Sequence, residues 1–525
     1  MTNHGSSDMT EPKSPERWVV HLRMTPPELK DNTADAERLV SCLKPILKTR
    51  HVDLDLFIMK KIPRIIRSAG YRVTCLVFKD RDRWILVDIK AQDDRTAFLG
   101  LAVDLGTTRV VFRLVDLETG VSLGESSFDN PQIAIGPDIL TRIHYTDQKG
   151  GLDHIHQMII DSFNLEIEKI SEKAGIAMGD ISLMAVAGNT TMTHLFLGIS
   201  PHFIIREPYI PGINRPGLHR AAELGINVNP GARVFVFPNI GSYFGGDLIA
   251  GIVYSGLNTK PEISILVDVG TNAEVVLGNN DFLIACAGAA GPALEGGVSS
   301  IGMMAGPGVI DRVWLNPDGS LGVHTIDEKP PVGICGSGFI DLAAMLFKSG
   351  AIDIRGRIVS DKHASRIRVI DEMNHLVIVA KENSGTGEDI CISQASLDSL
   401  IRSKAAMFTI LETIALNVGL TLQDLSVFYV AGTFGSFINP ESAITIGMIP
   451  DLPLETYKTL GNSSLGGAAM ILEDRNAIDQ VDEIRNSITY IELNVDQGFM
   501  NRFSGAKFIP HTNPELFPSV RLQNV

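Results

Sequence analysis

Leu99-Gly-Leu-Ala-Val-Asp-Leu-Gly-Thr-Thr108 is an apolar run that ends in an Asp-Leu-Gly-Thr-Thr turn, and it decides the fold. The nearly continuous apolar residues at 99–103 predict a strand that is buried on both faces. Strands are also expected at 110–115 and 121–126, because the turn sequence Glu118-Thr-Gly120 lies between them. The stretch therefore predicts an antiparallel meander in which Asp104 stands at the end of the first strand.

The same unit occurs a second time later in the chain. An apolar strand is expected at 263–267, and Asp268-Val-Gly-Thr-Asn272 follows it. Two further strands, at 273–277 and 281–286, are separated by the turn sequence Gly278-Asn-Asn280. A supersecondary unit that recurs within one chain indicates two related lobes, which we expect to face each other. The predicted fold class is therefore α/β, with a duplicated β-meander and helices in each lobe.

The chain divides into four parts by composition and pattern. Residues 1–16 are polar and predict a loose tail. At 17–97, helix and strand patterns predict a small αβ domain, whose second helix is expected to be interrupted at Pro63. This domain has no catalytic pattern, so we expect it to serve docking or dimerisation and the chain to form a homodimer. The first lobe is expected at 98–262 and the second at 263–525.

The composition restricts the class of protein. The 525 residues include 44% hydrophobic residues and 49 glycines, which are typical of a globular α/β protein. The net charge of −15 argues against nonspecific binding to nucleic acid or to an anionic membrane. The polar N-terminal residues lack the apolar core of a signal peptide, and no apolar run reaches the roughly 18 residues of a membrane span. A cytoplasmic protein is therefore expected.

The two Asp-Gly-Thr turns are candidates for a phosphate site. A glycine after a strand-terminal aspartate lets the backbone approach a ligand, and the following N–H and hydroxyl groups can donate to phosphate oxygens. One such turn is usually a simple hairpin, but two copies in matching meanders favour a nucleotide. Asp104 and Asp268 are well placed to hold Mg²⁺ through water. The expected ligands are therefore ATP and Mg²⁺, and the phosphate-binding candidates are Gly106, Thr107, Thr108, Gly270, Thr271 and Asn272.

Further positions are candidates for the same site. We expect Gly432, Thr433 and Gly435, which follow an apolar strand, to lie against the adenine or the ribose. Asp247, at the start of a helix, either acts near the attacking water and the metal or caps the helix. Glu295, in a glycine-rich loop, is a candidate general base or metal ligand. The candidate catalytic carboxylates are thus Asp104, Asp268, Asp247 and Glu295.

Several other chemistries lack their patterns in this sequence. The histidines do not occur at metal-ligand spacing, and no GxSxG, HExxH or Walker sequence is present. The five cysteines are dispersed, the closest pair being Cys42 and Cys75, so no iron–sulfur cluster is expected on this chain. The sequence therefore does not support a serine hydrolase, a zinc enzyme or a P-loop protein.

The order of the motifs resembles a known family. Two Asp-x-Gly-Thr meanders followed by Ala431-Gly-Thr-Phe-Gly435 are similar to those of acetate and sugar kinases, heat-shock chaperones and actin. A narrower resemblance is to the ATP-dependent reductive activators of corrinoid proteins. It rests on further segments in the same order, at 130–132, 188–195, 238–247, 289–296, 333–338, 447–450 and 461–464. The resemblance implies two actin-like lobes of ribonuclease H-like topology.

The resemblance also implies a function. Such proteins use ATP to return the inactive Co(II) of a corrinoid protein to Co(I) in methyl-transfer systems. They usually carry an iron–sulfur domain at one end, and neither end of this sequence has its cysteines. We therefore expect a corrinoid protein as partner and a separate low-potential electron donor. Two alternatives would use the same site, a small-molecule kinase and a non-catalytic ATP-dependent scaffold.

Overall fold

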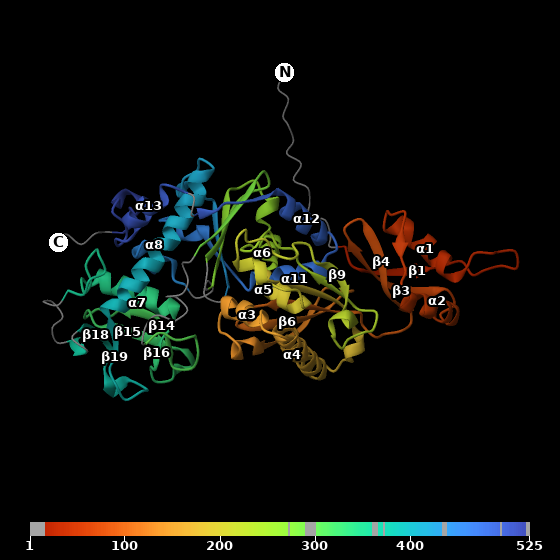
Figure 1. Ribbon diagram of the computed structural model, residues 1–525, viewed down its shortest axis with the longest axis horizontal. Coiled ribbons are helices and arrows are strands. Elements are labelled where there is room, and N and C mark those ends of the chain that lie inside the picture. The colour runs from red at the N-terminus through yellow and green to blue at the C-terminus, as the bar shows by residue number, and fades with distance from the viewer. Residues whose placement is uncertain are drawn as a thin grey trace, which may run out of the picture. The chain divides into compact units, whose positions relative to one another are not determined.

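The computed structural model, shown in Figure 1, contains two compact units. Unit 1 consists of Met1–Tyr254 and Ser464–Asn486, and unit 2 consists of Ser255–Ser463 and Ser487–Val525. The structure describes residues 16–270, 273–288, 301–359, 366–370, 373–432, 438–493 and 496–520. No helix within these ranges is long and apolar enough to cross a membrane.

The first predicted meander forms one half of a six-stranded sheet in unit 1. The strands lie in the order β7-β6-β5-β8-β10-β9. β5 pairs antiparallel with β6 and parallel with β8, and β8 pairs parallel with β10. The first strand of the meander is therefore central, which explains its continuous apolar sequence. The bounds are β5 Leu99–Leu105, β6 Arg109–Asp116, β7 Ser122–Asp129, β8 Ile181–Gly188, β9 Gly217–Arg220 and β10 Arg233–Val236.

Helices of unit 1 bury the apolar faces of this sheet. One side of α4 is apolar at helical spacing and packs on the meander, with the rings of Phe163 and Phe112 4.9 Å apart between centroids. Asn189 caps α5, because its side chain accepts a hydrogen bond from the backbone N–H of Met192 at 2.9 Å. The bounds are α3 Ile139–Thr146, α4 Gly151–Ala174, α5 Thr190–Leu197 and α6 Gly246–Ser255.

The chain returns to unit 1 near its C-terminus. Helices α11 (Ser463–Glu473) and α12 (Ala477–Ser487) supply this segment, which the sequence-based limits count with the second lobe. A Cβ on Gly467 of α11 would lie 2.0 Å from the carbonyl oxygen of Ala250 in α6, so the two helices can approach closely only with glycine at this point. The predicted limits of the four parts, 1–16, 17–97, 98–262 and 263–525, stay predictions.

The small αβ domain predicted from the sequence belongs to unit 1. Its sheet has the order β1-β3-β4-β2, and α1 and α2 pack with it (Figure 1). The prediction that Pro63 interrupts the second helix is wrong, since α2 continues through it; Pro63 is exposed, so water can solvate the carbonyl that its missing N–H leaves unbonded. The bounds are β1 Val19–Arg23, α1 Asp35–Ile46, β2 Val52–Asp53, α2 Leu56–Ser68, β3 Arg72–Asp80 and β4 Arg83–Ala91.

The second predicted meander forms the centre of a six-stranded sheet in unit 2, in the order β21-β20-β11-β12-β13-β22. β11 pairs antiparallel with β12 and parallel with β20, and β20 pairs parallel with β21. Five successive strands thus repeat the order and directions found in unit 1, which confirms the predicted duplication. The bounds are β11 Ser264–Val269, β12 Ala273–Gly278, β13 Leu283–Gly288, β20 Val427–Ala431, β21 Tyr457–Gly461 and β22 Ile488–Tyr490.

Unit 2 carries additional elements between β13 and β20. Two three-stranded sheets, β15-β14-β16 and β17-β18-β19, precede the long helix α8. The strand bounds are β14 Val309–Leu315, β15 Leu321–Thr325, β16 Gly333–Ile334, β17 Ile367–Ile370, β18 Met373–Val379 and β19 Ile390–Ser393. Within the described residues, unit 2 contains the helices α7 Gly336–Lys348, α8 Gln394–Asn417, α10 Pro440–Thr445 and α13 Phe499–Ala506.

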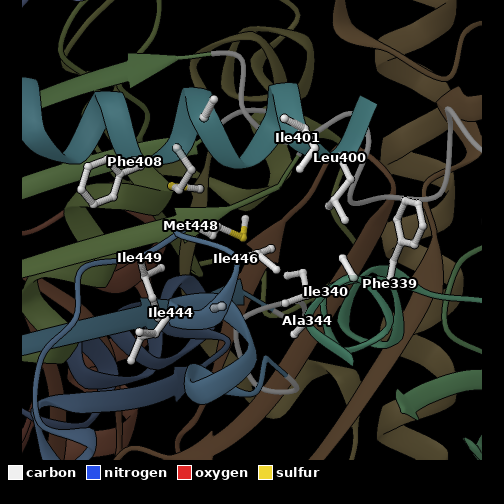
Figure 2. Close-up of a cluster of buried hydrophobic side chains, with 14 of the residues drawn as sticks. Phe339, Ile340, Ala344, Leu400, Ile401, Phe408, Ile444, Ile446, Met448 and Ile449 are labelled. Atoms are coloured by element: carbon white, nitrogen blue, oxygen red, sulfur yellow. The ribbon is translucent and has the colours of Figure 1, made fainter. Parts of the chain in front are cut away.

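The core of unit 2 joins α7 and α8 to the segment at and after α10. Figure 2 shows side chains from these three places pointing toward one another. They are Phe339, Ile340 and Ala344 of α7, Leu400, Ile401 and Phe408 of α8, and Ile444, Ile446, Met448 and Ile449. All ten are buried, so this cluster is a principal source of hydrophobic stabilisation in unit 2.

Candidate functional site

Asp104 stands where three strands of the unit 1 sheet end. It is the next-to-last residue of β5 and lies opposite Val111 in β6 and Ala187 in β8. The Asp104 side chain is half-buried at this edge. Gly106 follows, and a Cβ there would lie 2.3 Å from the carbonyl oxygen of Arg109. The tight turn after β5 therefore requires glycine.

Three polar side chains hold the Gly106–Thr107 part of this turn. Asn130 Nδ2 donates to the carbonyl oxygen of Gly106 at 2.9 Å. Arg142 Nη2 donates to the carbonyl oxygen of Thr107 at 2.7 Å, and Asn189 Nδ2 donates to Thr107 Oγ1 at 2.9 Å. Asn130 and Arg142 are buried, so these bonds form largely away from water.

These contacts orient the N–H groups of the turn. In a trans peptide the carbonyl oxygen and the next N–H point in opposite directions. Because the carbonyls of Gly106 and Thr107 are turned toward Asn130 and Arg142, the N–H groups of Thr107 and Thr108 are turned away from those side chains. Two successive N–H groups aimed to one side can bind an anion such as a phosphate.

Arg142 is the residue of this arrangement that the sequence did not reveal. It lies in α3 and is fully buried, and it also donates to the carbonyl oxygen of Gly136 at 2.9 Å and to Gln132 Oε1 at 3.3 Å. Burial lowers the pKa of Arg142 to about 10, so the guanidinium stays charged at neutral pH. No motif surrounds it, and its partners lie in other turns, so no local signal could have identified it. Asn130 and Asn189 lie in segments that carry the family resemblance.

Asp247 lies in the same neighbourhood of unit 1. It is the second residue of α6, so it is not the residue that caps this helix from outside. A Cβ on Gly245 would lie 2.5 Å from both the Cα of Asn189 and Oδ1 of Asp247. The structure thus brings Asp247 beside Asn189, which contacts Thr107. The negative carboxylate in the first turn also suits the positive end of the helix dipole.

Unit 2 repeats part of this arrangement. Asp268 is the next-to-last residue of β11 and lies opposite Glu274 in β12 and Ala431 in β20. Gly432 follows Ala431 with φ +84°, and a Cβ there would lie 2.9 Å from Oδ1 of Asp268. The structure therefore brings the predicted residues Asp268 and Gly432 together. In unit 1 the corresponding glycine is Gly188, which is the last residue of β8.

Five of the predicted site residues lie outside the described residues. Their predicted roles stay predictions, and they are Thr271, Asn272, Glu295, Thr433 and Gly435. Gly270, the glycine of the second Asp-Gly-Thr turn, is described and half-buried.

The carboxylates fit Mg²⁺ bound together with a nucleotide. Among the described residues, no group of three or more His, Cys, Asp and Glu side chains could hold a metal ion by itself. Mg²⁺ is commonly bound by one or two carboxylates while phosphate oxygens and water complete its octahedron. Asp104 and Asp268, each next to a predicted phosphate turn, are oxygen donors of the required kind.

The space beside Asp268 provides a first prediction. We expect Gly432→Ala to weaken ATP binding about tenfold or more, because its Cβ would meet Asp268 Oδ1 at 2.9 Å and displace that carboxylate. Gly419→Ala is the matched control, since Gly419 has a similar φ of +72° but nothing lies within 4 Å of its Cβ. Both variants share the backbone strain of about 1 kcal/mol. Calorimetric titration with Mg-ATP measures the difference, and equal affinities in the two variants would contradict the placement of Gly432.

Comparison with known proteins assigns the family. Models of three successive regions match the chain: the RACo linker region at residues 12–96, the RACo middle region at 99–260, and the C-terminal ASKHA domain of RACo at 262–521. The corrinoid activation enzyme RamQ of Eubacterium limosum is 31% identical over 458 residues, which cover 86% of this chain and 76% of RamQ. The chain belongs to the RACo family of reductive activators of corrinoid proteins.

Two further similar proteins agree with this assignment. The [Co(II) methylated amine-specific corrinoid protein] reductase of Methanosarcina barkeri is 26% identical over 430 residues, covering 74% of this chain and 73% of that protein. A solved structure described as a reductive activator for corrinoid, iron-sulfur protein is 38% identical, with a TM-score of 0.85, over 98% of this chain and 82% of that one. The ASKHA domain confirms the α/β fold class and the actin-like fold that the family resemblance implied.

Proposed function

We propose that this chain is an ATPase that drives the reduction of a corrinoid protein from inactive Co(II) to Co(I). The observation that carries the proposal is the Asp104 turn, whose carbonyl groups are held by Asn130 and Arg142 and whose Thr107 hydroxyl is held by Asn189, in an arrangement suited to phosphate. Membership of the RACo family supplies the class of partner, since the named relatives act on corrinoid proteins.

The Asp-Gly-Thr turns are proposed to bind nucleotide phosphate. In unit 1, Thr107 and Thr108 would donate to phosphate oxygens, and Asp104 would hold the Mg²⁺ that neutralises the phosphate charge. The Gly270 turn and Asp268 are the corresponding candidates of unit 2. Asp247, placed beside Asn189, is the described candidate for orienting the attacking water.

ATP would act by changing the affinity of the chain for its partner. A ligand shifts a conformational equilibrium only by the difference in its affinity for the two states. A complex that binds the Co(II) partner in one nucleotide state and releases the Co(I) partner in another would make the uphill electron transfer favourable. One electron reduces Co(II) to Co(I), the donor is oxidised by one electron, and hydrolysis of ATP to ADP and phosphate supplies the free energy.

The electron is proposed to come from a separate low-potential donor. A cluster requires several thiolates close together, and the five cysteines of this sequence are dispersed. Cys75 and Cys286 are buried, and burial raises the pKa of the Cys286 thiol to about 12 and that of Cys75 further. Burial therefore favours the protonated form of both thiols at neutral pH.

The proposal is tested by following the corrinoid spectrum. With ATP, Mg²⁺ and a low-potential reductant, the chain is expected to convert the Co(II) spectrum of its cognate corrinoid protein to that of Co(I), whereas ADP is not. If ATP makes no difference with any corrinoid protein of the same organism, the proposal fails. ADP release stimulated by a small metabolite, with no corrinoid protein present, would indicate a kinase, and nucleotide binding without turnover would indicate a scaffold.

A further inference from the structure

Three arginine side chains from distant parts of the sequence come together in unit 1. Arg81 lies in the turn between β3 and β4, Arg215 precedes β9, and Arg485 is in the last turn of α12. Arg81 and Arg215 line a small pocket of about 30 Å³. Arg485 lies one helical turn beyond Asp482, which lines the same pocket. We call Arg81, Arg215 and Arg485 the arginine cluster.

The positive charges of the arginine cluster act on one another. Asn486 Oδ1 accepts a hydrogen bond from Arg215 Nη2 at 2.5 Å and another from Arg485 Nη1 at 3.4 Å, so two guanidinium groups share one neutral acceptor. Burial lowers the pKa of Arg485, and the charges of Arg215 and Arg81 lower it further. Asp482 acts in the opposite direction. Like charges this close favour the binding of an anion that balances them.

Two N–H groups of the arginine cluster are buried and unpaired. Nε of Arg215 and Nε of Arg485 have no hydrogen-bond partner among the described residues. No carboxylate of these residues lies within 4.0 Å of a side-chain nitrogen of the cluster. Because buried polar groups in proteins are nearly always hydrogen-bonded, we expect an acceptor for both Nε groups.

The surroundings of the pocket leave an excess of positive charge. Two carboxylates, those of Asp80 and Asp482, line the pocket and oppose the three arginines. The Asp80 carboxylate is directed toward β9, since a Cβ on Gly217 would lie 3.8 Å from Asp80 Oδ1. Apolar residues complete the lining and strengthen the interaction of charges there. They are Phe235, Val236, Pro238, Ile478 and Val481.

Contacts within unit 1 hold the elements of the arginine cluster near one another. Lys79 Nζ of β3 pairs with Asp479 Oδ1 of α12 at 2.6 Å, which joins the β3–β4 hairpin to the helix. Asn486 at the end of α12 contacts Arg215. An anion would therefore find the cluster already assembled, which lowers the entropy cost of binding it.

We propose that the arginine cluster binds a tetrahedral oxyanion of the phosphate type, at residues distinct from those of the candidate nucleotide site. Guanidinium groups form paired hydrogen bonds with phosphate oxygens, and the anion supplies acceptors for the two buried Nε groups. A pocket of about 30 Å³ has room for one such group and is too small for a nucleotide. The bound anion joins the small domain, the loop before β9 and α12, and so stabilises unit 1.

Calorimetric titration of the full chain with sodium phosphate tests the site, without nucleotide or Mg²⁺ and at constant ionic strength. Arg81→Asn removes one charge and keeps a residue that tolerates the φ of +58°, and Arg215→Met removes another. Each is expected to raise the Kd for phosphate about tenfold or more. Asp482→Asn is expected to lower it about threefold, because a negative charge leaves the pocket. Arg83→Met is the matched control: Arg83 is on the same hairpin, its side chain is 66% exposed, and the Kd should not change.

The melting temperature provides a second measurement. Phosphate at about ten times its Kd is expected to raise the melting temperature of the unmodified chain by about 3 °C and to have little effect on Arg81→Asn. Arg81 is exposed, so this variant should melt like the unmodified chain when phosphate is left out. Displacement of phosphate by glycerol phosphate would indicate the phosphate group of a small ester as the ligand, and failure of displacement would indicate the free ion. Both results support the site.

Three results would overturn the proposal. The first is that the unmodified chain does not bind phosphate. The second is an equal Kd in the unmodified chain, Arg81→Asn and Arg215→Met, which would place the anion elsewhere, such as at the Asp104 turn. The third is weaker binding in Asp482→Asn. None of these titrations involves ATP turnover or a corrinoid protein, so the proposed function and this site can fail independently.

Discussion

Asp104→Asn and Asp268→Asn are each expected to lower ATP-dependent Co(I) formation by about 100-fold or more. Each carboxylate ends a central strand next to an Asp-Gly-Thr turn, where it is proposed to hold the Mg²⁺ of the nucleotide. Asparagine keeps the shape of the side chain and removes the negative charge, so the expected loss is in metal binding and not in folding. The rate of Co(I) appearance in the spectrum, measured over a range of Mg²⁺ concentrations, gives the effect.

Asp53→Asn serves as the control for these two variants. Asp53 is in β2 of the small domain, and its side chain is 54% exposed, so its loss should leave the rate unchanged. Thermal unfolding of all three variants shows whether the folds are intact. Full activity in Asp104→Asn or in Asp268→Asn would refute the assignment of that carboxylate to the site.

Arg142→Met is expected to lower the free energy of unfolding of unit 1 by about 3 kcal/mol. Arg142 is fully buried and donates to the carbonyl oxygens of Thr107 and Gly136 and to Gln132 Oε1. Methionine fills much of the volume but leaves these acceptors without the guanidinium, and buried acceptors that lose their partner are costly. Denaturant titration measures the change, and calorimetry at low temperature measures Mg-ATP affinity in the folded variant.

Two comparisons give this prediction its specificity. Arg83→Met should change stability by less than about 0.5 kcal/mol, because Arg83 is 66% exposed and its carboxylate partner lies 3.8 Å away. Arg142→Lys keeps the charge but presents a single nitrogen, so it should restore part of the stability and little of the ATP affinity. If Arg142→Met binds Mg-ATP as tightly as the unmodified chain, Arg142 does not position the turn.

Much of the fold could be predicted because its signals are local. The apolar residues at 99–103 and 263–267 each precede an aspartate and a glycine turn, and central strands require both features. The recurrence of this pattern indicated two lobes of the same topology, which the strand orders of the two units confirm. The prediction that Pro63 interrupts the second helix was wrong. The rule that proline ends a helix did not hold, because Pro63 is exposed and water can solvate the carbonyl that lacks a partner.

The candidate site was predictable only in part. Asp104, Asp268, Gly106 and Gly432 are visible in the sequence because each follows or ends an apolar strand. That Gly432 touches Asp268 depends on the parallel pairing of β11 with β20, strands separated by more than a hundred residues and two inserted sheets. Such pairing leaves no trace in the local pattern.

The sequence by itself determined the duplicated meander, the two aspartate turns and the family, because all of these are carried by short runs of residues in a fixed order. Only the tertiary structure decided which distant groups complete them. Arg142 reaches the Thr107 turn from α3, and Ser464–Asn486 returns to unit 1. The physical reason is that hydrogen bonding and packing act over a few ångströms in space, whatever the separation along the chain.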